Sequence, residues 1–180
     1  TVADRQGFRL TDPDTGPTRT LVDERFASGS SLDYSAGTPQ RLAWVGMQSH
    51  LAPSEAQPRA ATSTDGGGTW VEMGALERSM FGGEVAVDAT DPDRIVWVPA
   101  HNDGRDPRGV LVSSDGARTW STVDAGGDEM DVHRRNAWWF GRRALAADRV
   151  DGSFYLLADD ERLDVSTDGG ATWEPAAHAP

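Results

Sequence analysis

The sequence predicts an all-β fold of four-stranded antiparallel meanders, arranged as the blades of a β-propeller. The first observation is an octapeptide that occurs three times, as STDGGGTW (63–70), SSDGARTW (113–120) and STDGGATW (166–173). The second is its spacing, because Asp65, Asp115 and Asp168 are 50 and 53 residues apart, a period typical of stacked supersecondary units. The third is the abundance of turn formers, 20 Gly and 10 Pro in 180 residues, which indicates many short elements.

Each period contains four strand-like segments. The second segment is rich in Val, Ile and aromatic residues and reads RLAWVGM (41–47), RIVWVPA (94–100) and SFYLLAD (153–159). A turn precedes each of these, and an inner strand precedes each turn, as in SSLDY, GEVAVDA and RALAAD. The third strand enters the octapeptide and the fourth begins at its Trp. Trp44 and Trp97 lie inside strands, so we expect them in the core.

One period before Asp65, the segment DPDTGPTR (12–19) places Asp14 in register, 51 residues earlier. It keeps the Asp, Gly and Thr but has Arg where Trp is expected, so we interpret it as an eroded fourth copy. The blade repeats are then predicted at approximately 1–24, 25–75, 80–125 and 140–177. We therefore expect the chain to begin partway through a blade, past the two inner strands of that blade, and to hold about three and a half blades.

The octapeptide is predicted to stabilise the fold and not to perform chemistry. An Asp in a tight turn accepts hydrogen bonds from backbone amides ahead of it, and a Ser two residues earlier can do the same. Gly supplies the positive φ of the reversal, with Ala117 in its place in the second copy, and the Trp packs its ring on the sheet. The residues so assigned are Ser63, Asp65, Gly67, Trp70, Ser113, Asp115, Trp120, Ser166, Asp168, Gly170 and Trp173.

Composition excludes several classes of function. The formal net charge of −12 argues against nucleic acid binding, which needs a basic face. No apolar run approaches bilayer length, so we expect no membrane span, and the start of the chain does not have the pattern of a signal peptide. There is no Cys, and the four His have no ligand-type spacing. We therefore expect no metal and no cofactor.

The pattern S-x-D-x-G-x-T-W resembles the Asp-box, or BNR repeat, of sialidases, sortilin-type receptors, a photosystem assembly factor and glycoside hydrolase family 74. The segments SGSSLDYSAGTPQRLAWVG (28–46), GGEVAVDATDPDRIVWVP (82–99) and ALAADRVDGSFYLLADDERLDVSTDGGATW (144–173) are similar to family 74. The resemblance covers nearly the whole chain and matches the family's second propeller. It implies a seven-bladed propeller from a secreted, hence extracellular, xyloglucan-cleaving endoglucanase, in which two propellers enclose the substrate cleft.

The same resemblance implies a catalytic residue. In family 74 the second propeller opens with G-D-x-x-G-F, whose Asp looks like the general acid, and ADRQGF (3–8) places Asp4 there. Ala3 and Arg5 depart from the pattern, and an Arg beside an acid favours its ionised form. A turn Asp at a strand end therefore remains an equal alternative. Asp4 is expected on the rim opposite the octapeptides.

Long loops at 48–58, 101–107 and 125–140 are expected on the same rim, where sites on rigid scaffolds form. We interpret Trp138, Trp139 and Phe140 as sugar-binding aromatics, because a pyranose face stacks on an indole while its hydroxyls need polar partners. The alternative is that these residues begin the next inner strand and are buried. The loop that contains His101 and Asn102 could bind a cation or a sugar, although such a loop is more often simply solvated; we assign these two residues to sugar binding.

Two functions remain open. The first is a portion of an inverting endo-β-1,4-glucanase that acts on xyloglucan, with Asp4 as proton donor. Its catalytic base would lie in the first propeller, so this chain alone is expected to be inactive. The second is a non-catalytic propeller that binds a protein or peptide. Either way, the remainder of a parent protein or another chain is expected to complete the ring, because an unclosed propeller leaves exposed sheet faces.

Overall fold

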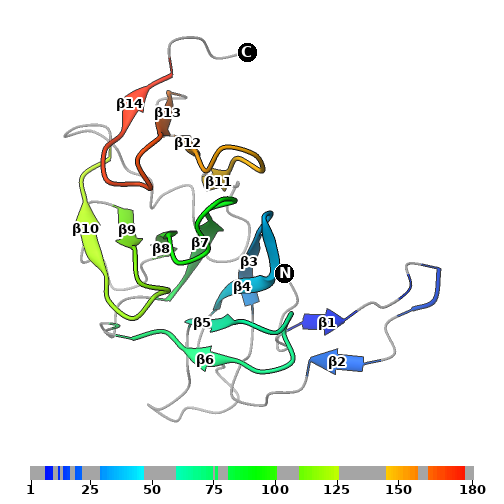
Figure 1. Cartoon of the computed structure of the whole chain (residues 1–180). Helices are drawn as coiled ribbons and strands as arrows, with labels where there is room; N and C mark the ends of the chain where they lie inside the picture. Colours follow the sequence, from blue (N-terminus) through cyan, green and yellow to red (C-terminus); the bar gives the residue numbers. More distant parts are fainter. Residues whose placement is uncertain are drawn as a thin grey trace.

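A computed structural model describes residues 7–9, 12, 14–16, 19–21, 29–46, 60–74, 76, 81–100, 110–125, 145–157 and 162–176. Within them the protein consists of strands and turns. A short sheet pairs β1 (Gly7–Arg9) with β2 (Arg19–Leu21). Three four-stranded antiparallel sheets follow in chain order, each a meander in which consecutive strands are neighbours (Figure 1).

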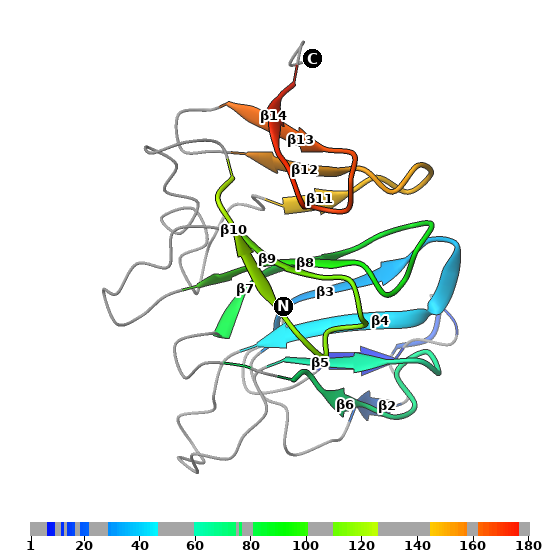
Figure 2. The ribbon, with the colours of Figure 1, turned by 60° about the vertical axis from the view of Figure 1, so that its left-hand side comes forward.

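The first sheet contains β3 (Gly29–Ser35), β4 (Thr38–Gly46), β5 (Ala60–Ser63) and β6 (Val71–Glu72). The second contains β7 (Phe81–Val87), β8 (Ile95–Ala100), β9 (Val110–Ser113) and β10 (Ser121–Val123). The third contains β11 (Leu145–Ala147), β12 (Phe154–Leu157), β13 (Leu163–Ser166) and β14 (Glu174–Pro175). The predicted four-stranded meander is therefore confirmed, and Figure 2 shows the sheets one above another.

The core lies between the sheets. One apolar cluster joins the first and second sheets and includes Val45 and Trp97. Another joins the second and third sheets and includes Val98 and Phe154. The second sheet is covered on both faces, so its strand β8 is apolar without alternation, as expected for a doubly buried strand. Trp44 and Trp97 are 1% and 0% exposed, which confirms them as core residues.

Two rims result from the meander order. The octapeptides join the third strand of each sheet to the fourth, and the turns between first and second strands lie at the same end (Figure 2). We call this end the octapeptide rim. The opposite rim is formed by the last residues of β4, β8 and β12 and the first residues of β5, β9 and β13.

Candidate functional site

Each octapeptide is held by a small hydrogen-bond network around its Asp. Asp65 Oδ1 accepts from the backbone N–H of Thr69 at 2.8 Å, and its Oδ2 accepts from the Thr69 hydroxyl at 2.8 Å. Ser63 donates to Asp65 at 2.8 Å and accepts from the N–H of Gly67 at 2.9 Å. The other two copies repeat these bonds, with Thr119 on Asp115 and Thr172 on Asp168. These carboxylates are occupied in closing their turns.

The hydrogen bonds also shift the pKa values of these aspartates. The backbone and hydroxyl of Thr69 lower the pKa of Asp65 to about 2. The Thr119 hydroxyl and backbone lower the pKa of Asp115. Burial raises the pKa of Asp168, but the bonds from Thr172 and Ser166 lower it by more. In all three the ionised form is favoured by folding.

Stability is therefore expected to fall with acid. An Asp whose folded pKa lies below its unfolded value of about 3.9 stabilises the fold above that pH and loses the contribution as pH falls through the folded pKa. We expect the thermal midpoint, followed by circular dichroism, to drop between about pH 4 and pH 2. The Thr119→Val variant lacks one donor, so its dependence on pH should be shallower. A constant midpoint over this interval would contradict the assignment.

The octapeptides also contact the preceding sheet, which sequence alone did not indicate. The N–H of Gly74, after β6, donates to the carbonyl of Ala117 at 2.9 Å. Ala117 has a φ of 68° and is buried in the cluster between the first and second sheets. Gly170 stands at the equivalent position in the third sheet, where a Cβ would lie 2.8 Å from Val96 and 3.1 Å from Val112 of the second sheet. These turns join neighbouring sheets.

The eroded first copy forms a different turn. Asp12 takes the place of the octapeptide Ser, and its Oδ1 accepts from the N–H of Asp14 at 2.9 Å. This turn lies between β1 and β2, which pair antiparallel as the third and fourth strands of the other sheets do. The local arrangement therefore matches the outer half of a further repeat.

A row of buried polar side chains joins the inner strands of the first and second sheets. Ser31, Asp33 and Ser35 share one face of β3 and each contacts the residue 54 positions later. Ser31 Oγ accepts from Val85 N at 3.3 Å, Asp33 Oδ2 accepts from Val87 N at 2.9 Å, and Ser35 Oγ donates to Ala89 O at 3.2 Å. Strand β7 is the edge strand of the second sheet, and the first two of these bonds give its Val85 and Val87 N–H groups an acceptor.

Asp33 also connects the first sheet with the third. Its Oδ1 accepts from Arg149 Nη2 at 2.6 Å, and Arg149 Nη1 donates to the carbonyl of Tyr34 at 2.9 Å. The guanidinium lies 4.9 Å from the centre of the Tyr34 ring, within range of a cation–π contact. The hydrogen bond that Arg149 donates to Asp33 raises the pKa of Arg149. One carboxylate thus links three sheets.

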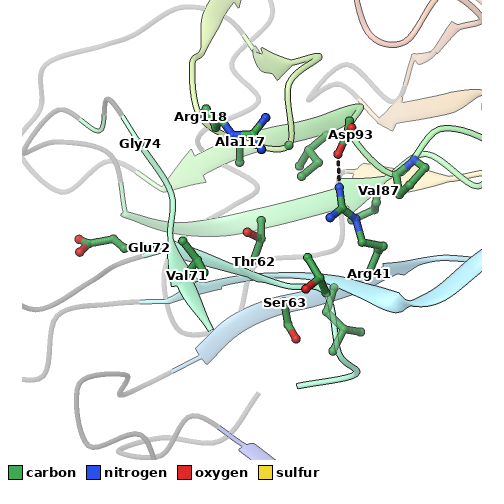
Figure 3. A pocket seen from close by; sticks show the side chains of 15 residues that line it. Arg41, Thr62, Ser63, Val71, Glu72, Gly74, Val87, Asp93, Ala117 and Arg118 are labelled. Carbon is green, nitrogen blue, oxygen red and sulfur yellow. Dashed lines mark hydrogen bonds and ion pairs between the residues drawn. The ribbon is translucent and has the colours of Figure 1, made fainter. Parts of the chain in front are cut away.

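A cleft of about 280 Å³ opens between the first and second sheets near the octapeptide rim. Thr62, Val71 and Glu72 line it from the first sheet, and Ala117 and Arg118 line it from the second, as Figure 3 shows. An ion pair between Arg41 and Asp93 crosses it. No aromatic ring is among the described residues that line it, so it offers no stacking platform for a sugar.

A buried ion pair lies near the opposite rim of the third sheet. Asp164 on β13 is 0% exposed, and Arg162, two residues earlier, donates from Nε to Oδ1 at 3.0 Å and from Nη2 to Oδ2 at 3.3 Å. Sequence reasoning did not identify this pair. The available signal was Asp164 in RLDVSTD (162–168), because the equivalent positions of the other two sheets hold the apolar residues Leu111 and Ala61.

The predicted chemical site falls outside the described residues. Asp4, the aromatic group of Trp138, Trp139 and Phe140, and the pair His101 and Asn102 all lie in segments whose placement is not described. These assignments therefore remain predictions. Within the described segments, no three His, Cys, Asp or Glu side chains gather as metal ligands, and no helix is long and apolar enough to cross a membrane.

The chain is similar in sequence to known xyloglucanases. No family model matches the chain. The chain is 28% identical over 173 residues to the xyloglucanase Xgh74A of Acetivibrio thermocellus, a match that covers 96% of this chain and 18% of the relative. The chain thus spans about a fifth of the length of this curated relative.

Solved structures share the architecture. The GH74 xyloglucanase of Xanthomonas campestris superposes with a TM-score of 0.64 at 24% identity, covering 85% of this chain and 19% of that structure. The chain has a β-propeller fold. A structure of YCF48 bound to D1 peptide also superposes, with a TM-score of 0.52 at 15% identity over 82% of this chain and 40% of that one.

Proposed function

We propose that this chain is a segment of the second propeller of an extracellular glycoside hydrolase that cleaves xyloglucan. The observation that carries the proposal is the 28% identity to a xyloglucanase along 96% of the chain. The octapeptides are compatible with it, because their sequence resembles the Asp-box, which family 74 shares with several other families. The xyloglucanase aligns in sequence with nearly every strand of the chain. Such a match favours a common activity more than a similarity of fold alone, as with the YCF48 structure.

The proposal requires further polypeptide, and an uncovered sheet face supports this. In β3, Leu32 and Tyr34 are 43% and 41% exposed. In the strand register, Leu32 and Tyr34 of the first sheet are equivalent to Val85 and Val87 in β7 of the second sheet. Val85 and Val87 are only 4% and 1% exposed because the first sheet covers them. Two inner strands beside β3 would bury Leu32 and Tyr34 in the same way. We infer that the missing half of a blade occupies this face.

The proposed chemistry is inverting hydrolysis with two carboxyl groups. In such enzymes the acid and base lie about 6.5–9.5 Å apart, with room for a water molecule. Asp4 is the proposed acid, which protonates the leaving oxygen, and the base is proposed to lie in another part of the full-length polypeptide. Trp138, Trp139 and Phe140 are proposed to stack on sugar rings, with His101 and Asn102 contacting hydroxyls.

The test is the hydrolysis of xyloglucan, followed by the release of reducing ends. The full-length polypeptide is expected to cleave xyloglucan, and this 180-residue chain alone is expected to be inactive because the base is proposed to lie in another part of the polypeptide. Hydrolysis by the chain alone would refute the two-part site. Binding of a peptide with no binding of xyloglucan by the full-length polypeptide would instead favour a non-catalytic propeller.

A further inference from the structure

The three octapeptides contain a dipeptide that rearranges easily in unfolded chains. Each has Asp followed by Gly, at 65–66, 115–116 and 168–169. The glycine nitrogen can attack the aspartate carboxyl carbon, because glycine has no side chain that hinders the approach. The nitrogen loses its proton, one carboxyl oxygen leaves as water, and a cyclic imide forms. Water then opens the imide at the former main-chain carbonyl, which gives isoaspartate with an additional methylene group in the backbone.

An isoaspartate at this place would damage the contact between sheets. Two residues after Asp115, Ala117 is 1% exposed within the apolar cluster between the first and second sheets. Its carbonyl accepts the N–H of Gly74 from the first sheet at 2.9 Å. A longer backbone at Asp115 would displace Ala117, and close-packed cores tolerate such shifts poorly. The fold therefore depends on a peptide bond that is chemically vulnerable.

Hydrogen bonds hold both carboxylate oxygens of Asp115 in the second octapeptide. Its Oδ1 accepts from the backbone N–H groups of Arg118 at 2.9 Å and Thr119 at 3.0 Å, and from the Ser113 hydroxyl at 2.8 Å. Its Oδ2 accepts from the Thr119 hydroxyl at 2.7 Å. Ring closure pulls the carboxyl carbon onto the nitrogen of Gly116 and removes one of the two oxygens. Because both oxygens are bonded, the reaction must break charge-assisted hydrogen bonds whichever oxygen leaves.

The attacking nitrogen is also engaged in the first two copies. The N–H of Gly116 donates to the carbonyl of Asp93 at 2.9 Å, and that of Gly66 donates to the carbonyl of Gln40 at 2.9 Å. The nitrogen must lose this proton in order to attack, and each bond ties the proton to the turn before the second strand of the sheet. Attack therefore costs a backbone hydrogen bond in addition to the carboxylate bonds.

The charge of the carboxylate opposes the reaction as well. A carboxyl oxygen leaves as water only when it is protonated, so the ionised group is the unreactive form. The Thr119 hydroxyl and backbone lower the pKa of Asp115, and the backbone and hydroxyl of Thr69 lower the pKa of Asp65 to about 2. At neutral pH the reactive form is therefore scarcer than in the unfolded chain.

We propose that the octapeptide network protects its own Asp–Gly bond from isomerisation, and that the Thr hydroxyl on Oδ2 is a necessary part of this protection. Closing the turn requires backbone donors, and these bond to Oδ1 in each copy. The hydroxyls of Thr69, Thr119 and Thr172 bond instead to Oδ2 in all three copies. They engage the second oxygen, which the backbone donors leave to them. This role of the octapeptide does not depend on the proposed function.

The test follows isoaspartate at each site during prolonged incubation of the full-length polypeptide at neutral pH. Trypsin cleaves after Arg108 and Arg118, so the peptide 109–118 carries Asp115 and has the same sequence in every Thr119 variant. Chromatography separates and quantifies its isoaspartyl form. Thr119→Val is expected to raise the rate at Asp115 about tenfold, as for the loss of one hydrogen bond to a charged group. Thr119→Ser keeps the hydroxyl and is expected to have the wild-type rate.

Asp65 and Asp168 are controls within the same molecule, because they lie in other tryptic peptides, 60–78 and the one that begins at 163. Their rates are expected to stay unchanged in Thr119→Val, at a temperature at which thermal unfolding shows every variant folded. Equal increases at all three sites would assign the effect to global destabilisation and overturn the proposal, as would an unchanged rate at Asp115.

A second measurement needs no variant. The free peptide 109–118 is expected to isomerise at least about tenfold faster than the same segment of the folded wild type, because it lacks the bonds from Thr119 and the carbonyl of Asp93. Equal rates in the peptide and in the folded protein would overturn the proposal.

Discussion

Replacing Asp33 with alanine is expected to lower the free energy of unfolding by about 2–4 kcal/mol. The carboxylate is 7% exposed and accepts from both Val87 N and Arg149. Its removal leaves a buried N–H on β7 without an acceptor and a guanidinium without its counterion. The loss affects three sheets at once. The measurement is denaturant unfolding followed by tryptophan fluorescence.

Arg149→Met is the matched variant for Asp33→Ala. Arg149 is 45% exposed, so its ion pair is weakened by solvent, and we expect a loss of only about 1 kcal/mol. The asymmetry follows because Asp33 keeps the bond from Val87 when Arg149 is removed. A double-mutant cycle isolates the ion pair itself. Equal losses of unfolding free energy in the two single variants would show that the hydrogen bond from Val87 N–H to Asp33 adds no stability.

The Gly170→Ala variant is expected to lose about 2–4 kcal/mol of folding free energy. Gly170 has a φ of 91°, which strains any residue with a side chain. In addition, the new methyl group would meet Val96 at 2.8 Å and Val112 at 3.1 Å, both on the neighbouring sheet. Both the backbone strain and the close contacts with the neighbouring sheet therefore oppose this substitution. Denaturant unfolding again measures the change.

Two further variants separate strain from crowding. Gly67→Ala has a similar φ of 85°, but its nearest neighbours, Leu42 and Trp70, are at an ordinary 3.5 Å. We expect it to cost only the backbone strain, about 1 kcal/mol. Ala117→Gly relieves that strain but removes a buried methyl group, so we expect a change within about 1 kcal/mol. A loss for Gly170→Ala no larger than that for Gly67→Ala would disprove the contact between sheets.

Local patterns in the sequence were sufficient to predict the fold. Alternating and continuous apolar segments marked the strands, and the octapeptide period of about fifty residues separated the sheets. Trp44 and Trp97 could be assigned to the core because each lies within an apolar strand. These signals work because strand patterning and turn chemistry depend on neighbours in the chain.

Contacts between sheets could not be predicted in the same way. Asp33 lies in SSLDYS (30–35), where polar residues alternate with Leu32 and Tyr34, and the pattern alone does not say which face is buried. The apolar residues are the exposed ones here, because the polar face bonds to β7. Arg149, which bonds to Asp33, lies 116 residues away in the sequence. The roles of Thr69, Thr119 and Thr172 were detectable, since each recurs at one position of the octapeptide.

We proposed above that the rim opposite the octapeptides carries the site that acts on xyloglucan. The most direct measurement is the rate of xyloglucan hydrolysis by the full-length polypeptide with Asp4→Asn, beside Glu174→Gln as a control on the exposed strand β14. Asparagine cannot donate the proton, so we expect the rate to fall about 10²–10⁴-fold for Asp4→Asn and to stay unchanged for Glu174→Gln. An Asp4→Asn variant with the wild-type rate would contradict it.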